Sequence, residues 1–158
     1  MVTIGVEAPD FTAPLVGEET DPFTLSDVLG SGPVVLAFFP AAFSSTCTVE
    51  LCTFRDDHSR FDELGATVFG ISTDLPYALS RFRSDHGIDY SFVSDNDGSI
   101  IDAYDVVETW DHIALRGVAQ RAVFVVDTGG VITYAWRANN PGEEPDYEAV
   151  AAAVEDAS

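Results

Sequence analysis

Residues 38–52 read FFPAAFSSTCTVELC, and the rest of the chain is organised around them. The run before them, residues 34–39, is short, apolar and rich in β-branched and aromatic residues, which predicts a buried strand. Apolar residues then recur at helical spacing, so we expect a helix over about residues 45–64. Pro40 should end the strand, and Ser44, Ser45 and Thr46 are all residues that can cap the helix through a side-chain oxygen. The stretch therefore predicts a strand, a loop and a helix start.

Cys47 falls in the first turn of the expected helix. Unpaired N–H groups and the positive end of the helix dipole stabilise a thiolate at such a position. A strand, a loop and a cysteine at a helix start form a platform for a nucleophile. The alternative is an inert buried thiol, which is the common state of a free cysteine.

The charge of the chain is strongly unbalanced, with 27 acidic residues against 7 basic ones and a formal net charge of −20. Nucleic acids and anionic membranes are polyanions that bind through basic patches, so neither is an expected partner. The composition resembles that of proteins from salt-accumulating halophiles. The simpler interpretation is a solvated acidic surface that avoids association.

Self-repulsion of this size should destabilise the folded state at low ionic strength, because salt screens repulsion between charges. We therefore predict that folding requires high salt. Unfolding followed in dilute buffer and in molar potassium chloride tests this prediction. Equal stability in the two solutions would contradict it.

Targeting segments and disulfide frameworks are not apparent in the sequence. The first residues, MVTIG, carry neither the basic flank nor the apolar segment of a signal peptide. No apolar stretch reaches the roughly 18–20 residues of a membrane span, so we expect a soluble, cytoplasmic protein. The two cysteines, Cys47 and Cys52, argue against a disulfide framework and are too few for a structural zinc site. Redox chemistry or core packing remain as their roles.

The length of 158 residues predicts one domain over residues 1–158. Strands alternate with helices and are followed by a hairpin and a closing helix, which predicts a three-layer α/β sandwich with a mixed central sheet flanked by helices. The other expected strands are residues 67–72, 92–95, 122–127 and 131–136, and residues 23–29 should form a short strand followed by a one-turn helix. The other expected helices begin near residues 76, 100 and 147.

Three segments are expected to be irregular or peripheral. Residues 5–15 should form an extended edge segment, because their prolines limit regular pairing. Residues 17–22 should form an acidic turn, and residues 105–118 are expected to be mostly loop.

The stretch around Cys47 resembles the peroxiredoxin family, the AhpC/TSA thiol peroxidases. The motif of that family is a proline, three residues, a threonine or serine, two residues and a cysteine, and it stands here as Pro40, Ser44 and Cys47. The order of matches extends over almost the whole chain, and the resemblance implies a thioredoxin-like fold. The further matching residues are Glu50, the runs 8–11, 54–56 and 72–74, and Arg121.

The resemblance implies a role for each of these residues. Cys47 would attack the terminal peroxide oxygen, and the always-ionised Arg121 would stabilise the thiolate and the developing charge of the leaving group. Ser44 would bond the peroxide or the thiolate, and Pro40 would shield the site from water. Glu50 would orient Arg121 or another arginine, although it could equally be a solvated helix residue.

Cys52 resembles the resolving cysteine of the bacterioferritin-comigratory (PrxQ-like) subgroup. In an intact helix, residues five apart have Cα atoms about 8–9 Å from each other, whereas a disulfide needs less than about 7 Å. The first turn must therefore unwind before Cys47 and Cys52 can bond. The alternative is that Cys52 is a core residue and Cys47 works as a one-cysteine peroxidase.

The implied activity is reduction of hydrogen peroxide and organic hydroperoxides, with electrons from a thioredoxin-like protein or a small thiol. No metal, haem or flavin cofactor is implied, and the chain would be a monomer or a homodimer, with Phe43 as a dimer contact or as a lid over the site. A thiol–disulfide oxidoreductase is a rival, but it would carry a Cys-x-x-Cys pair. A copper chaperone of the same superfamily would have three residues between its cysteines, and this chain has four.

Overall fold

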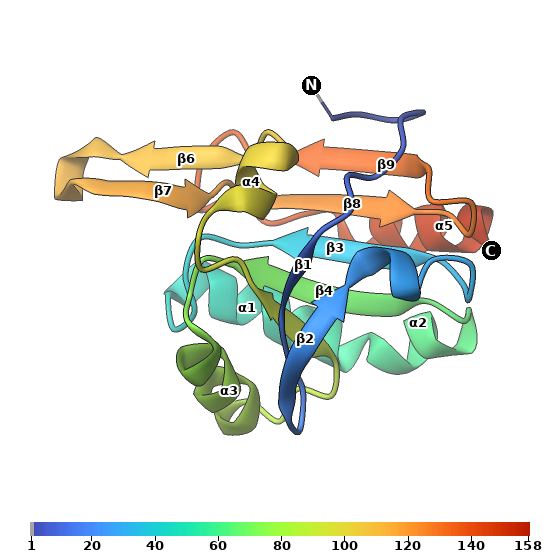
Figure 1. Cartoon of the computed structure of the whole chain (residues 1–158), viewed down its shortest axis with the longest axis horizontal. Coiled ribbons are helices and arrows are strands. Elements are labelled where there is room, and N and C mark those ends of the chain that lie inside the picture. Colours follow the sequence, from blue (N-terminus) through green and yellow to red (C-terminus); the bar gives the residue numbers. More distant parts are fainter. Residues whose placement is uncertain (1) are drawn as a thin grey trace.

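A computed structural model of the chain describes residues 2–158 (Figure 1). Its strands are β1 (Thr12–Val16), β2 (Thr20–Thr24), β3 (Val34–Phe38), β4 (Thr67–Ser72), β5 (Ser91–Ser94), β6 (Val107–Trp110), β7 (Leu115–Ala119), β8 (Ala122–Val126) and β9 (Ile132–Arg137). Its helices are α1 (Ser45–Asp56), α2 (His58–Glu63), α3 (Pro76–Asp85), α4 (Ser99–Ala103) and α5 (Tyr147–Ala157). Two short 3-10 turns are η1 (Leu25–Asp27) and η2 (Asp111–Ile113).

A seven-stranded mixed sheet runs through the molecule in the order β2-β1-β5-β4-β3-β8-β9. Strand β3 is parallel to β4 and antiparallel to β8. All five residues of β3 are buried, as its unbroken apolar sequence VVLAF requires of a strand covered on both faces. The chain that leaves β3 therefore starts its loop and α1 from the middle of the sheet.

Helices cover both faces of the sheet, which makes three layers (Figure 1). Successive residues of a strand point to opposite faces. Val35 and Ala37 accordingly belong to one core cluster with residues of α1, α2, α3 and α5, whereas Leu36 and Phe38 belong to a second cluster with residues of η1 and α4. The predicted three-layer α/β architecture with a mixed sheet is confirmed.

The helix expected over residues 45–64 is divided into α1 and α2. The two helices meet at Asp57, whose φ of −90° and ψ of 0° lie in the bridge region. Aspartate is a poor residue for a helix interior because its side chain competes for backbone hydrogen bonds. The prediction of one continuous helix was therefore wrong at Asp57. Phe54 and Phe61 still share one core, with ring centroids 6.0 Å apart.

The segment expected at the sheet edge, residues 5–15, contains most of β1, which is the second strand of the sheet rather than the edge strand. Strand β1 pairs with β2 on one side and with β5 on the other, so β2 is the edge strand and residues 20–22 belong to it rather than to a turn. Pro14 lies directly opposite Pro22. The two residues that lack an N–H thus share one position of the ladder, which explains why their presence does not prevent pairing.

Residues 105–118 are not mostly loop, because β6 and β7 form a separate two-stranded sheet. This hairpin extends beyond the main sheet, on the left of Figure 1. Most of its residues are exposed or half-buried, so no apolar face repeats along it with a period of two. The alternation that identifies a half-buried strand is therefore missing from the sequence. Among the described residues, no helix combines the length and the apolar character needed to cross a membrane.

Candidate active site

The pairing of β3 with β8 brings the two ends of the site together. In this antiparallel pair Phe38 lies opposite Ala122, so the end of β3 is beside the start of β8. The chain leaving β3 forms the loop 39–44 and then α1, while the residue that precedes β8 is Arg121. Cys47 and Arg121 are 74 positions apart in the sequence and meet at this point.

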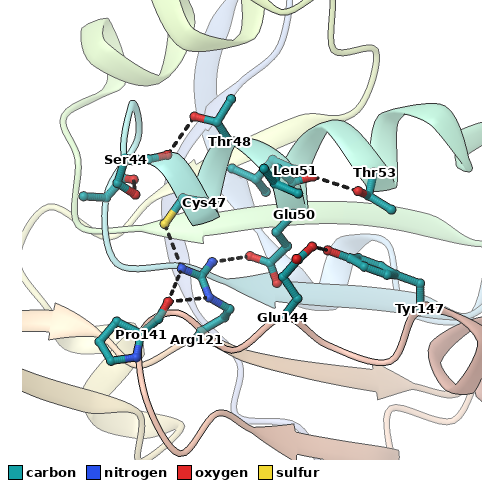
Figure 2. A network of polar contacts seen from close by, with 12 residues as sticks. Ser44, Cys47, Thr48, Glu50, Leu51, Thr53, Arg121, Pro141, Glu144 and Tyr147 are labelled. Carbon is teal, nitrogen blue, oxygen red and sulfur yellow. Dashed lines mark hydrogen bonds and ion pairs between the residues drawn. The ribbon is translucent and has the colours of Figure 1, made fainter.

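Arg121 binds two side chains of α1 with its guanidinium fork (Figure 2). Its Nη2 donates to Cys47 Sγ at 3.2 Å, and its Nη1 donates to Glu50 Oε1 at 2.8 Å. All three side chains are buried, with Cys47 and Glu50 fully covered and Arg121 only 2% exposed. The structure thus brings together three of the residues singled out from the sequence. It places the permanent positive charge of the Arg121 guanidinium next to the thiol sulfur.

The carbonyl oxygen of Pro141 is a third partner of Arg121. It accepts from Nη2 at 2.9 Å and from Nε at 3.3 Å, from the loop between β9 and α5 (Figure 2). Backbone carbonyls do not depend on residue type, so no pattern in the sequence indicates this contact. With Glu50 and Pro141 on its other sides, the guanidinium has one orientation toward Cys47.

The Glu50 carboxyl has an unusual environment for an ion-pair partner. Burial raises the pKa of Glu50 to about 7, although the charge and the hydrogen bond of Arg121 lower it and the nearby Glu144 carboxylate adds a small rise. Its second oxygen, Oε2, has no hydrogen-bond partner among residues 2–158. The cost of removing the carboxylate from water therefore exceeds the attraction of Arg121.

This raised pKa makes folding stability depend on pH. A carboxyl that titrates near 4.5 when unfolded and near 7 when folded favours the native state below about pH 4.5, and that contribution is lost as the pH rises to about 7. Relative to Glu50→Gln, the wild type should lose about 3 kcal/mol of unfolding free energy over this window. Urea unfolding in high salt from pH 4.5 to 8 measures the difference.

A matched control for this prediction is Glu63→Gln, which removes a carboxylate from an exposed position of α2. It should follow the wild type at every pH. A constant difference between wild type and Glu50→Gln across the window would contradict the raised pKa of Glu50.

Ser44 and Pro40 lie beside this cluster without touching the sulfur in the described contacts. Ser44 is the N-cap of α1, but its hydroxyl donates to the Ala41 carbonyl oxygen at 2.9 Å instead of capping the helix, so the expected capping bond is absent from the described chain. Its own carbonyl accepts from the Thr48 N–H and hydroxyl. Pro40 is buried after the end of β3. Roles toward a peroxide remain predictions for both residues.

A hollow of about 200 Å³ opens beside Arg121. It is lined by Ser44, Ser45, Thr46, Trp110, Arg121, Pro141 and Gly142. The lining joins the start of α1 to the β6 strand and to the loop after β9, which lie far apart in the sequence. Trp110 was not among the site residues predicted from the sequence, because it lies in the segment 105–118 that was expected to be loop.

A larger hollow of about 480 Å³ lies between α4 and the β6–β7 hairpin, with Asp97, Ser99 and Asp102 in its lining. No cysteine or arginine lines it, so its size does not make it the candidate active site. Among residues 2–158, no three His, Cys, Asp or Glu side chains are grouped so that they could hold a metal ion.

Both cysteines are free thiols in this structure. Cys47 is the third residue of α1, as predicted, and Cys52 lies on the same unbroken helix and is half-buried. Helical geometry keeps their Cα atoms about 8–9 Å apart, beyond the reach of a disulfide. The structure is therefore that of the dithiol state, with the first turn of α1 wound.

Several known proteins resemble this chain in sequence and in fold. A family model described as "AhpC/TSA family" matches residues 4–135. Peroxiredoxin Bcp of Bacillus subtilis is 31% identical over 137 residues, which are 86% of this chain and 85% of that protein. The structure of peroxidoxin BcpB from Mycobacterium tuberculosis superposes with a TM-score of 0.87 at 28% identity and covers 100% of this chain and 99% of that one. A PrxQ variant from Xylella fastidiosa, at 24% identity and a TM-score of 0.86 over 99% of this chain and 97% of that one, shares the fold.

Proposed function

This chain belongs to the AhpC/TSA family of peroxiredoxins, which are thiol peroxidases, and on that basis we propose that Cys47 is the residue that reacts with the peroxide. The observation that carries the proposal is the 3.2 Å contact from Arg121 Nη2 to Cys47 Sγ at the start of α1. A thiolate there is stabilised by the guanidinium, by the unpaired N–H groups of the first turn and by the helix dipole.

In the first step the Cys47 thiolate attacks the terminal oxygen of a hydroperoxide, the O–O bond breaks and the other oxygen leaves as water or an alcohol after taking up a proton. The sulfur becomes a sulfenic acid, so cysteine is oxidised by two electrons and the peroxide is reduced by two. The Arg121 guanidinium stabilises the thiolate before the attack and the leaving oxygen during it. The hollow beside Arg121 is the space through which the peroxide arrives.

In the second step Cys52 attacks the sulfenic sulfur, a disulfide forms and water leaves. Because both residues lie on one helix, the first turn of α1 must unwind for this bond to form. An external dithiol then returns two electrons and two protons to restore both thiols. We propose a thioredoxin-like protein as that reductant, with a small thiol as the alternative.

The assembly of the chain is proposed to be a homodimer, with a monomer as the alternative. The exposed apolar residues near the loop that precedes α1 support self-association. Phe43 is 54% exposed on one side while its ring packs edge-on against Phe82 of α3, with centroids 5.3 Å apart. Val49, Leu75 and Tyr77 are also exposed. Sedimentation of the reduced protein in high salt distinguishes the two states.

The test of the function is intact mass after the protein is reduced, freed of reductant and mixed with one equivalent of hydrogen peroxide in high salt. Loss of two hydrogens in the wild type, with gain of one oxygen in Cys52→Ser, is the result expected of a two-cysteine peroxidase. Gain of oxygen in both proteins would show a one-cysteine enzyme in which Cys52 is a core residue. No mass change in either protein would overturn the proposed function.

A further inference from the structure

A polar cluster of two buried serines and the half-buried Asp74 joins the carboxyl ends of β4 and β5. Ser72 ends β4 and Ser94 ends β5, and both are fully covered. The Ser72 hydroxyl donates to Asp74 Oδ2 at 2.7 Å, and the Asp74 N–H is 3.2 Å from the same hydroxyl oxygen. The Ser94 hydroxyl donates to the Asp74 main-chain carbonyl at 2.6 Å. These bonds hold the Asp74 side chain in one position at the end of the sheet.

Asp74 also binds the loop that leads into α1. The Ala42 N–H donates to Asp74 Oδ2 at 2.8 Å. Ala42 lies five residues before Cys47. The next residue, Phe43, has a φ of +70°, a left-handed conformation that costs a bulky L-residue free energy and persists only where its surroundings impose it. The Ala42–Asp74 bond fixes the main chain immediately before this strained residue.

We propose that Asp74 is a positioning residue that keeps the first turn of α1 wound, with Cys47 against Arg121. This inference rests on the function proposed above. The carboxylate is a charge-assisted acceptor for the loop N–H, and Asp74 is held by Ser72 and Ser94, which lie at the ends of β4 and β5 rather than on the loop. The loop thus has a fixed anchor, and release of that anchor allows the turn to open.

The two steps of the reaction place opposite demands on this anchor. Attack on the peroxide requires the wound turn, since only there does Cys47 contact Arg121. Closure of the Cys47–Cys52 disulfide requires the unwound turn. Asp74 therefore favours the first step and slows the second, whereas a residue that served only stability would not act on them in opposite directions.

Asp74→Ala and Asp74→Asn separate these effects. The alanine removes both bonds to Oδ2, while the asparagine keeps one acceptor oxygen of the same shape. Loss of a hydrogen bond to a charged group changes an opening equilibrium by roughly 10- to 100-fold. The Ser94 bond survives in both variants because it uses the main-chain carbonyl of Asp74. The matched control is Asp62→Asn, which removes one carboxylate from an exposed position of α2.

The first measurement is amide hydrogen exchange of the reduced proteins. Exchange over residues 48–51, whose N–H groups bond the carbonyls of the first turn of α1, should be faster than in the wild type by at least about tenfold in Asp74→Ala and by less in Asp74→Asn. Exchange in α5 should be unchanged, and Asp62→Asn should match the wild type throughout. Unchanged exchange over residues 48–51, or an equal increase over the whole chain, would overturn the proposal. Because this measurement involves no peroxide, it tests the role of Asp74 in the turn even if the chain proves not to be a peroxidase.

The second measurement is the time course of intact mass after rapid mixing with one equivalent of hydrogen peroxide. Loss of two hydrogens should follow the sulfenic acid about tenfold faster in Asp74→Ala than in the wild type. Formation of the sulfenic acid itself, measured in the Cys52→Ser background, should be slower than in Cys52→Ser alone. Slower disulfide formation in Asp74→Ala would overturn the proposal, and so would faster sulfenic acid formation.

Discussion

The Cys47→Ser protein is expected to consume hydrogen peroxide no faster than buffer, a loss of at least about 10³-fold. The substitution exchanges sulfur for oxygen at a fully buried position, so the fold and the contact with Arg121 should be kept. A serine hydroxyl stays protonated at neutral pH and is a far weaker nucleophile than a thiolate. Peroxide consumption in the presence of an excess of dithiol, in high salt, measures the effect.

The matched control is Cys52→Ser, which changes the other cysteine of the same helix in the same way. It should react with one equivalent of peroxide at the wild-type rate and then fail to be recycled by a thioredoxin-like reductant. Peroxide consumption by Cys47→Ser at a rate near that of the wild type would contradict the assignment of Cys47 and with it the proposed mechanism.

The Arg121→Ala protein is expected to react with peroxide roughly 10²- to 10³-fold more slowly, the usual cost of removing one donor aimed at developing charge. The guanidinium contacts the thiol sulfur directly and also lines the hollow of about 200 Å³. Arg121→Lys should recover only part of the rate, because an ammonium group cannot donate to Cys47, Glu50 and Pro141 in the same plane. Stopped-flow measurement of the second-order rate constant tests both variants.

Stability should fall as well in Arg121→Ala, because Glu50 then lies buried without its partner. Breaking a buried ion pair costs about 3–5 kcal/mol when the remaining group is charged. The raised pKa of Glu50 limits this cost below about pH 7, where the carboxyl takes up a proton. Arg121→Ala combined with Glu50→Gln should therefore recover stability but not rate.

The control for Arg121 is Arg116→Ala, which removes an exposed arginine of β7. It lowers the positive charge by the same amount and should leave the rate constant within about twofold of the wild type, as is usual for surface substitutions. A rate constant for Arg121→Ala within that same range would exclude the proposed role of the guanidinium.

Most elements of the fold are predictable from the sequence because their signals are local. The run 67–72 is apolar and β-branched and forms β4 over the same residues, Pro76 begins α3, and residues 147–157 form α5. The placement of Cys47 in the first turn of α1 is of the same kind, since it depends on a strand end, a proline and helical spacing within a few residues. Arg121 and Glu50 were predicted as site residues only through the resemblance to a family, because no local hydrophobic periodicity points to either of them.

Tertiary structure decided everything that depends on partners far apart in the chain. The β6–β7 hairpin and the interior position of β1 depend on pairing rather than on apolar alternation. The contact of Arg121 with Cys47 follows from the register that sets Phe38 opposite Ala122. The bond from Ala42 to Asp74 depends in the same way on β3 and β4 being neighbours. Local residue patterns specify where a strand begins and ends, but the free energy of packing selects its neighbours, and those neighbours assemble the site.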